Sequence, residues 1–510
     1  MQRSILRRLV PATARSSSSA SPLPRHFDLN DPVRQTNLFI NNEFVPSSNG
    51  ATFDTFNPAT EERIASVAEA TPADVDAAVK AARDAFNGTW RTIDAVERGR
   101  LIYRLADLIE ENGDELADLE SLDAGKPRSL TRFLDVEACI NTLRYFAGWA
   151  DKIHGSTIPI PGPYLCYTKE EPVGVCAQIT PWNFPLIMTS WKLGPALATG
   201  NTVVLKPAKQ TSLTALRVAE LIVEAGFPEG VVNIVTGGGC TVGAHLTQHS
   251  DVDKVALTGS TETGLKVLRT SHVDNIKRIS LELGGKSANI ILDDADIDAA
   301  IRQSQVGLFL NAGQVCIAGS RVYVQEGIYD EFVRRSGEAA SSMKIGDPQD
   351  LSVQHGPQID DVQFKKILAY IETGKKEGAR LICGGKRWGN RGFYIEPTVF
   401  ADVTEEMTIA REEIFGPVMS IIKFKTIDEV IERANNSEYG LGAGVVTSSL
   451  DNAIKISNSV RVGTVYVNCY TVIEANTPFG GFKNSGVGRE QGMQGLRNYL
   501  ESKTVIIKTP

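Results

Sequence analysis

Short runs of apolar, β-branched residues alternate with segments of helical periodicity through the middle of the chain. Each run has the length of a buried strand, and the segments between them have the apolar spacing of helices. The expected strands are Val173 to Pro181, Asn201 to Lys206, Val231 to Val235 and Lys254 to Thr258. Strands that alternate with helices form βαβ units, so this region is predicted to fold as a dinucleotide-type α/β domain with a parallel sheet.

A second series of the same kind begins after Gly284-Gly285. Strands are expected at 288–292, 321–325, 418–424, 442–447 and 465–468, with helices at 297–309, 329–342 and 427–435. The chain is therefore predicted to contain two doubly wound α/β domains. Two β-branched runs, Tyr164 to Lys169 and Thr504 to Lys508, have no local partner and are expected to join a sheet elsewhere, on this or another subunit.

The N-terminal part is predicted to be a hairpin followed by helices. Asn37 to Val45 alternates around a turn at Asn41-Asn42, and Asp54 to Thr60 reads as a turn-rich connector. Thr71 can cap a helix that starts at Pro72. Further helices are expected at 97–112, 114–122 and 135–152.

Composition excludes several classes of protein. The 510 residues exceed one ordinary core, and 42% apolar with 22% charged residues indicates a soluble globular chain without a run of about 18 apolar residues. A net charge of −8 argues against nucleic acid or an anionic membrane as partner. Seven scattered cysteines without a CxxC pair indicate free thiols. No metal site is expected, because His245 and His249 lack the glutamate of the HExxH pattern.

The first 25 residues have a composition of their own. They contain five arginines and a serine run, Ser16 to Ser19, and the first acidic residue is Asp28. An Arg-rich, Ser-rich and acid-poor segment is typical of a mitochondrial transit peptide, which predicts location in the mitochondrial matrix. A disordered tail is the alternative.

Cys316 is the strongest candidate for a catalytic residue. It lies in NAGQVCIAGSR among small, flexible residues, and Glu282 precedes it in LELGGKS. A thiol that a substrate can approach, with a carboxylate as base, suits covalent catalysis followed by hydrolysis. A buried small residue is the alternative reading of such a cysteine.

Other segments are suited to binding a nucleotide or an oxyanion. Thr258 to Gly264 (TGSTETG) follows a strand and opens a helix, where free amides and the helix dipole favour phosphate, although a plain helix cap has the same pattern. Lys206 ends a strand and can reach a ligand over the sheet. Asn183 in PWNFP can donate to an oxyanion, and Glu413 in EEIFGP can bind a sugar diol. In the alternative readings, Lys206 is a solvated surface lysine, Asn183 forms a turn and Glu413 is an acid at the start of a helix.

Taken together, these motifs resemble the aldehyde dehydrogenase superfamily. PWNFP, LKPAKQT, TGSTETG, LELGGKS, the Cys316 segment, EEIFGP and PFGGFKNSG occur in the order and spacing of that family. The resemblance runs from about residue 35 to the C-terminus and is closest to the NAD(P)-dependent, non-acylating members of mitochondrial class 2 and cytosolic class 1. It implies oxidation of an aldehyde to a carboxylic acid with NAD, and a homotetramer built as a dimer of dimers.

The resemblance also implies a role for each motif residue. Cys316 would be the nucleophile, Asn183 an oxyanion donor, and Glu282 the base that activates water for thioester hydrolysis. The implied cofactor-binding residues are Trp182, Lys206, Lys209, Gly259, Ser260, Thr261, Glu262, Thr263, Gly264, Gln363, Lys366, Glu413 and Phe415. The implied aromatic residues of the substrate tunnel are Phe184, Trp191 and Phe479.

Two departures from the family pattern predict specificity. NAD-preferring relatives usually have Glu where this chain has Lys209, and a cation there can attract a 2′-phosphate, so NADP is expected to be accepted beside NAD. A lysine turned to solvent is the alternative. Ala138 is small, and Val315 and Ile317 replace cysteines beside the nucleophile, while Leu310 and Ile473 also fall at variable tunnel positions. We predict that the entrance of the substrate tunnel admits bulkier apolar aldehydes as well as acetaldehyde.

The implied organisation divides the chain into four parts. Residues 1–25 are the transit peptide, 26–152 with 173–284 the NAD(P)-binding domain, 285–485 the catalytic domain, and 153–172 with 486–510 a small β oligomerisation element. Two rival functions remain open. A scaffold that kept the fold would not need the four residues Cys316, Glu282, Asn183 and Lys206, and an acylating dehydrogenase, which passes its thioester to coenzyme A, lacks the base at Glu282.

Overall fold

The computed structural model describes residues 33, 35–272 and 274–510. The predicted transit peptide, residues 1–25, lies outside this range. Within the described residues, no helix combines the length and the apolar character needed to cross a membrane.

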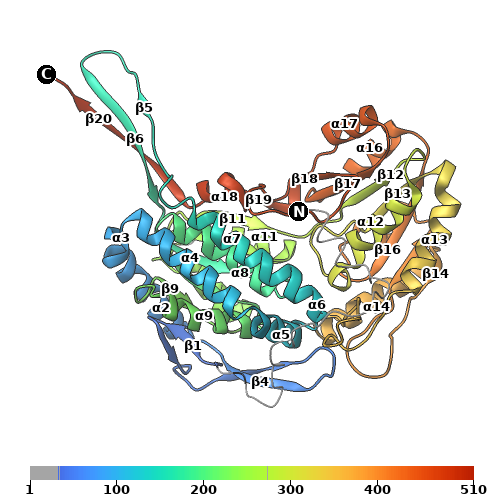
Figure 1. The fold of residues 1–510 in the computed structure, drawn as a ribbon, viewed down its shortest axis with the longest axis horizontal. Coiled ribbons are helices and arrows are strands. Elements are labelled where there is room, and N and C mark those ends of the chain that lie inside the picture. Colours follow the sequence, from blue (N-terminus) through green and yellow to red (C-terminus); the bar gives the residue numbers. More distant parts are fainter. Residues whose placement is uncertain (1–32, 34, 273) are drawn as a thin grey trace, which may run out of the picture. The chain divides into compact units, whose positions relative to one another are not determined.

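Five parallel strands form the centre of an eight-stranded sheet (Figure 1). They are β7 (Val175–Ile179), β8 (Thr202–Lys206), β9 (Val232–Ile234), β10 (Lys254–Thr258) and β11 (Arg278–Glu282), in the spatial order β11-β10-β7-β8-β9. The order reverses between β7 and β10, which is the doubly wound pattern of dinucleotide-binding folds. In such sheets, ligands bind beyond the carboxyl ends of the strands at the reversal, and β7 and β10 therefore mark the expected crevice.

Antiparallel strands close both edges of this sheet. At one edge, β1 (Leu38–Ile40) and β2 (Glu43–Val45) form the predicted hairpin, and Asn41 and Asn42 take the positive φ of its two-residue turn. At the other edge, β19 (Gly486–Val487) pairs with β11.

Helices cover both faces of the sheet, because strand side chains alternate between them. Side chains of α2 (Pro72–Asn87), α10 (Ala244–Gln248) and α11 (Thr261–Thr270) form one apolar core with Ala177 of β7. Gln178, the next residue, donates to the carbonyl of Lys192 in α8 (Pro185–Ala198) on the opposite face. The other long helices of this half are α9 (Leu213–Ala225), α4 (Ala95–Glu111), α5 (Gly113–Ala124) and α7 (Glu137–Ala147).

The second series of elements forms a seven-stranded sheet, in the order β14-β15-β16-β13-β12-β17-β18. Its strands are β12 (Ala288–Ile291), β13 (Arg321–Gln325), β14 (Arg380–Cys383), β15 (Thr398–Ala401), β16 (Val418–Phe424), β17 (Gly442–Val446) and β18 (Thr464–Val467). Its longer helices are α12 (Ile297–Phe309), α13 (Tyr329–Ser341), α14 (Asp361–Lys376), α16 (Ile427–Asn435) and α17 (Leu450–Ser459). Except at β14, neighbouring strands are parallel, and the α/β fold class is confirmed.

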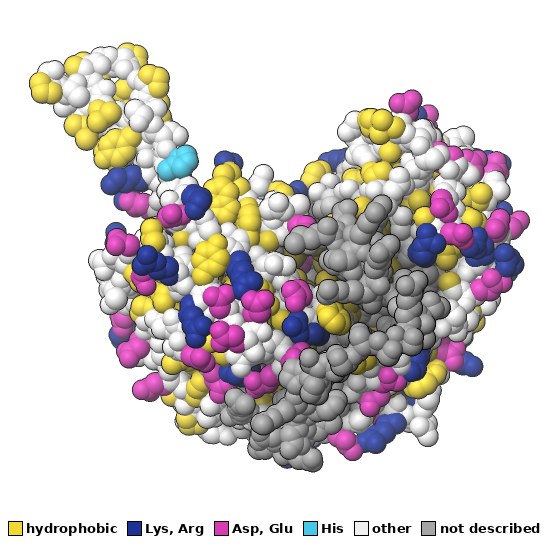
Figure 2. Space-filling view, in the orientation of Figure 1, with side chains coloured by type: hydrophobic (Ala, Val, Ile, Leu, Met, Phe, Trp, Pro, Cys, Tyr) yellow, Lys and Arg dark blue, Asp and Glu magenta, His cyan; other side chains and the backbone are white. Residues whose placement is uncertain are grey.

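The two β-branched runs without a local partner pair with each other. β20 (Leu500–Lys508) runs antiparallel to β6 (Tyr164–Pro172), with Lys508 opposite Tyr164, and β5 (Thr157–Ile158) completes a three-stranded ribbon. Exposed apolar side chains gather on this ribbon (Figure 2), and they belong to Ile158, Tyr164, Leu165, Ile506 and Ile507. The division into domains stays a prediction, and at one predicted boundary β19 pairs with the eight-stranded sheet instead of the ribbon.

The predicted connector at Asp54 to Thr60 is partly wrong. Residues up to Phe56 belong to β3 (Thr52–Phe56), which pairs with β4 (Arg63–Ala68) in a hairpin that the sequence pattern did not indicate. The Asp54 carboxylate accepts from Ser66 Oγ across the hairpin at 2.5 Å. This cross-strand polar pair holds Asp54, a residue type common in turns, inside a strand.

Candidate active site

The Cys316 segment links α12 to β13 through an unusual turn. Asn311, Ala312 and Gly313 have φ values of 49°, 54° and 77°, three consecutive residues in the left-handed region. A Cβ on Gly313 would lie 2.2 Å from the Gly416 carbonyl oxygen, so this position admits only glycine. Backbone held in such conformations concentrates at functional sites, and here it brings the cysteine against the loop that carries Glu413.

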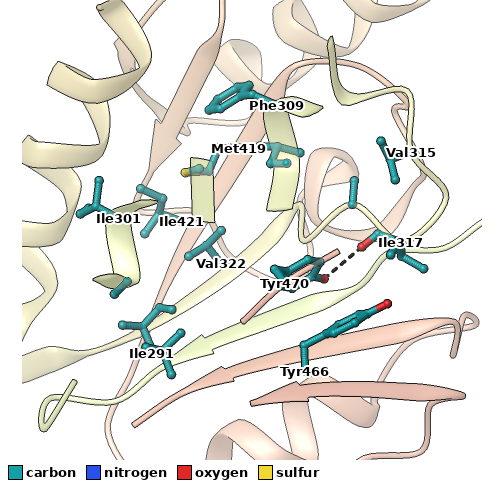
Figure 3. Close-up of a cluster of buried hydrophobic side chains, with 14 of the residues drawn as sticks. Ile291, Ile301, Phe309, Val315, Ile317, Val322, Met419, Ile421, Tyr466 and Tyr470 are labelled. Carbon is teal, nitrogen blue, oxygen red and sulfur yellow. Dashed lines mark hydrogen bonds between the residues drawn. The ribbon is translucent and has the colours of Figure 1, made fainter. Parts of the chain in front are cut away.

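An aromatic side chain fixes the other flank of the cysteine. The Tyr470 hydroxyl donates to the Ile317 carbonyl at 3.0 Å (Figure 3). Cβ atoms added to Gly307, Gly319 or Gly444 would lie 2.5 to 3.0 Å from the Tyr470 ring. Three glycines from separate elements therefore leave space for one ring, which holds the main chain directly after Cys316.

Glu282 and Cys316 come from two segments that meet closely, since a Cβ on Gly285 would lie 2.5 Å from the Cys316 carbonyl oxygen. Glu282 ends β11 and is 2% exposed, and its carboxyl group and the half-buried Cys316 thiol shift the pKa of each other. Burial raises the pKa of Glu282 to about 8, and the charge of Glu490 adds to the shift. Burial and the adjacent Glu282 hold the pKa of Cys316 well above its ordinary value. At neutral pH the pair is therefore mainly a thiol beside a neutral carboxyl, with a base available once Glu282 ionises.

A buried ion pair behind Glu282 was missed by the sequence analysis. Lys192 of α8 is fully buried, donates to Thr258 Oγ1 at 2.7 Å and forms an ion pair with Glu490. Thr258 is the strand neighbour of Glu282. A lone lysine among the apolar residues of α8 was the available signal, since a buried cation needs a partner.

Asn183 joins the loop after β7 to the Cys316 segment. Its Nδ2 donates to the Gln314 carbonyl at 2.9 Å, and its own carbonyl accepts from Asn311 Nδ2 at 2.8 Å. All three residues are buried. The Asn183 amide nitrogen carries a second N–H besides the one that bonds to Gln314, so the proposed role as an oxyanion donor is chemically possible.

The expected phosphate site lies at the start of α11. Ser260 caps this ten-residue helix and accepts from the Thr263 amide at 3.2 Å, while a Cβ on Gly264 would lie 2.6 Å from Leu283. Glu262 points along the helix to Lys266, with 2.6 Å between the charged atoms. The amides of Thr261 and Glu262 lie in the first turn of the helix, where N–H groups have no helical acceptor, and a Cβ on Gly259 would touch only Leu257, at 3.9 Å.

Lys206 and Lys209 flank the carboxyl end of β8. Lys206 is 4% exposed and donates to the Pro207 carbonyl at 2.9 Å. Burial lowers the pKa of Lys206 to about 8, and the negative charge of Glu69 opposes this lowering. A buried cation without a carboxylate bonded to it can bind the ribose and phosphate oxygens of a dinucleotide, so the residues present fit NAD.

The Glu413 loop closes the crevice from the seven-stranded sheet. The Glu413 carboxylate accepts from the Gly285 amide at 2.9 Å, and Phe415 meets Trp182 edge to face with ring centroids 5.2 Å apart. Gln363 donates to the carbonyls of Ile414 and Phe415, at 3.1 and 2.8 Å. Gln363 thus supports the loop, and Lys366 follows it on α14.

The three predicted tunnel aromatics belong to one apolar cluster with Val315 and Ile317. Trp191 and Phe479 meet edge to face at 5.2 Å, and the Lys126 ammonium lies 4.0 Å from the centroid of the Phe184 ring. Ala138 and Leu310 pack on this cluster, whereas Ile473 is 38% exposed. Cys316 packs against the same cluster, whereas the assignment of these residues to a substrate tunnel stays a prediction.

Comparison with known proteins identifies the family of the chain. The aldehyde dehydrogenase family profile matches residues 44–505. The chain is 56% identical to aldehyde dehydrogenase 1A1 of Gallus gallus over 97% of this chain and 99% of that one. It is 57% identical to the mitochondrial aldehyde dehydrogenase of Homo sapiens, over 99% and 97%. The NAD+ complex of aldehyde dehydrogenase from Bacillus cereus superposes with a TM-score of 0.92 and 51% identity, over 94% and 97%.

Proposed function

The chain belongs to the aldehyde dehydrogenase family and is an NAD-dependent aldehyde oxidoreductase, and we propose that it works by covalent catalysis at Cys316. The close approach of the Glu282 and Cys316 segments, with the buried Glu282 carboxyl acting on the thiol, carries this proposal. A buried carboxyl with a pKa near 8 is suited to accept protons at the pH at which a thiol must be activated.

In the first half-reaction, the Cys316 sulfur attacks the aldehyde carbon and the thiol proton passes to Glu282. The Cys316 amide and Asn183 Nδ2 donate to the oxyanion, and a donor of this kind typically contributes about 3–4 kcal/mol. Bound NAD supplies the hydride acceptor. Loss of hydride from the adduct leaves a thioester on Cys316, and Glu282 releases its proton to solvent.

In the second half-reaction, Glu282 takes a proton from a water molecule whose oxygen attacks the thioester carbon. The carbon–sulfur bond breaks, the carboxylic acid leaves, and Glu282 returns the proton to the Cys316 sulfur. The neighbouring charge of Glu490 raises the pKa of Glu282 and so makes its carboxylate a stronger base. Hydrolysis, not transfer to coenzyme A, is the outcome that this base favours.

The proposed substrates are acetaldehyde and other aliphatic or bulkier apolar aldehydes. Phe184, Trp191 and Phe479 offer an apolar lining, and Ala138, which has a small side chain, packs against the same cluster. NADP is proposed as a second cofactor because of Lys209, and Lys206, Ser260 and Glu413 are proposed to bind the dinucleotide.

Assembly and location are proposed on separate grounds. The exposed apolar side chains on the ribbon of β5, β6 and β20 support burial against other subunits in a homotetramer. The composition of residues 1–25 and the mitochondrial relative support the mitochondrial matrix. Light scattering and mass spectrometry of the imported mature chain would check these two proposals.

The test of the activity follows absorbance at 340 nm with acetaldehyde and NAD, in the absence of coenzyme A. The expected result is one carboxylic acid formed per NADH, and loss of activity in Cys316→Ser. Cys469→Ser is the matched control, because Cys469 is also a half-buried free thiol. Activity that survives in Cys316→Ser, or that requires coenzyme A, would contradict the proposal.

A further inference from the structure

Two lysines, Lys206 and Lys209, lie at the end of β8, where an acidic residue that distinguishes NAD from NADP is expected. In doubly wound sheets, an acid after the second parallel strand accepts from the adenosine 2′-hydroxyl, whereas a cation there binds a 2′-phosphate. β8 is the second strand of the parallel series, and it runs into Lys206-Pro207-Ala208-Lys209. This segment itself contains no carboxylate.

A carboxylate reaches the same place from another part of the chain. Glu69 directly follows β4, and its main chain is held by a 2.8 Å bond from its amide to the Ala51 carbonyl. Its Oε1 accepts from the Gly238 amide at 3.3 Å. A Cβ on Gly237 would lie 3.3 Å from Glu69 Cγ, so the side chain runs closely along the loop after β9. The carboxylate is therefore positioned at the carboxyl ends of β8 and β9.

Glu69 interacts with both lysines. The Lys209 ammonium lies 3.9 Å from Glu69 Oε1 and 4.7 Å from the centroid of the Phe53 ring, so it is held between a carboxylate and an aromatic face. The side chains of Lys209 and Glu69 are 45% and 30% exposed, which leaves both accessible to a ligand. The charge of Glu69 also acts on Lys206, where it opposes the lowering of the pKa by burial.

We propose that Glu69 determines the cofactor preference of this dehydrogenase. Its carboxylate neutralises Lys209, accepts from an adenosine 2′-hydroxyl and repels a 2′-phosphate, so NAD is preferred although a lysine stands where the discriminating acid is expected. The inference rests on the NAD-dependent activity but not on the covalent mechanism at Cys316. Lys209 then admits NADP as the poorer cofactor and binds the 2′-phosphate more strongly when Glu69 loses its charge.

The decisive experiment measures ligand binding by calorimetry with adenosine 2′,5′-bisphosphate and with 5′-AMP. For Glu69→Gln, affinity for the bisphosphate should rise about tenfold, as expected for removal of one partly screened charge, while affinity for 5′-AMP changes less than about threefold. The gain should shrink in high salt, and most of it should disappear in Glu69→Gln combined with Lys209→Met. In turnover, the kcat/KM ratio of NADP to NAD should rise by the same factor.

Glu62→Gln is the matched control, because it removes the same charge from the same hairpin at a residue paired with Arg391. It should leave the preference for the bisphosphate unchanged. An unchanged preference in Glu69→Gln, or an equal gain for both ligands, would overturn the proposal. If Glu69→Gln lowers the melting temperature, Lys209→Glu provides a second test, since a second carboxylate should weaken bisphosphate binding by at least tenfold. Because binding needs no turnover, an inactive enzyme would contradict the mechanism at Cys316 without affecting this test.

Discussion

Replacing Glu282 by Gln separates the two halves of the proposed reaction. The variant keeps the size of the side chain but cannot accept a proton, and loss of a general base typically costs about 10² to 10⁴ in rate. At pH 9, where the thiolate forms more readily, Cys316 should still attack the aldehyde. Stopped-flow absorbance should then show a burst of one NADH per active site, followed by turnover slowed at least about a hundredfold.

The same variant should change the reactivity of the thiol in a pH-dependent way. With a pKa of about 8, roughly one Glu282 in ten is ionised at pH 7 and about nine in ten at pH 9. Burial raises the pKa of the Cys316 thiol and the ionised Glu282 carboxylate raises it further, so removal of that charge should lower the pKa of the thiol at pH 9. Alkylation by iodoacetamide should therefore be at least about fivefold faster than in wild type at pH 9, and similar at pH 7.

These two readouts can refute the reasoning independently. A burst that disappears at pH 9 would mean that Glu282 is needed for attack and not mainly for hydrolysis. Alkylation rates that match wild type at both pH values would mean that Glu282 does not act on the Cys316 charge. Glu97→Gln, on an exposed face of α4, should behave as wild type in both assays.

Three further predictions concern the surroundings of the site. Asn183→Ala should lower kcat about 10² to 10³-fold and abolish the NADH burst, because attack loses an oxyanion donor; an unchanged burst would exclude that role. Tyr470→Phe removes the donor to the Ile317 carbonyl and should cost about 1–3 kcal/mol in urea unfolding, with slower turnover. Burial lowers the pKa of His355 to about 4, so the unfolded chain binds more protons between about pH 6.5 and 4, and stability should fall by about 3 kcal/mol across that window. In His355→Gln, urea titrations should show a smaller loss of stability between pH 6.5 and about 4 than in wild type.

The parallel sheets were predictable because their strands are buried on both faces. Such strands are continuous apolar runs, and the helices between them have their own period, so the segments from Val173 to Thr258 could be assigned without the structure. The hairpin of β3 and β4 could not, because Asp54 belongs to a strand only through its contact with Ser66 on the partner strand. The evidence that Asp54 belongs to a strand therefore comes from the pairing of β3 with β4 and not from the sequence of either strand.

Local sequence by itself determined which chemical groups the protein has, namely a thiol among small residues, a carboxylate at a strand end and the glycines around them. The tertiary structure alone decided which of these groups interact. Glu490 and Lys192 lie 298 residues apart, yet they form the ion pair behind Glu282. Glu69 comes from a hairpin with no recognisable motif and reaches Lys209. Charges act through distance in space, and only the packed sheets bring such remote residues within reach.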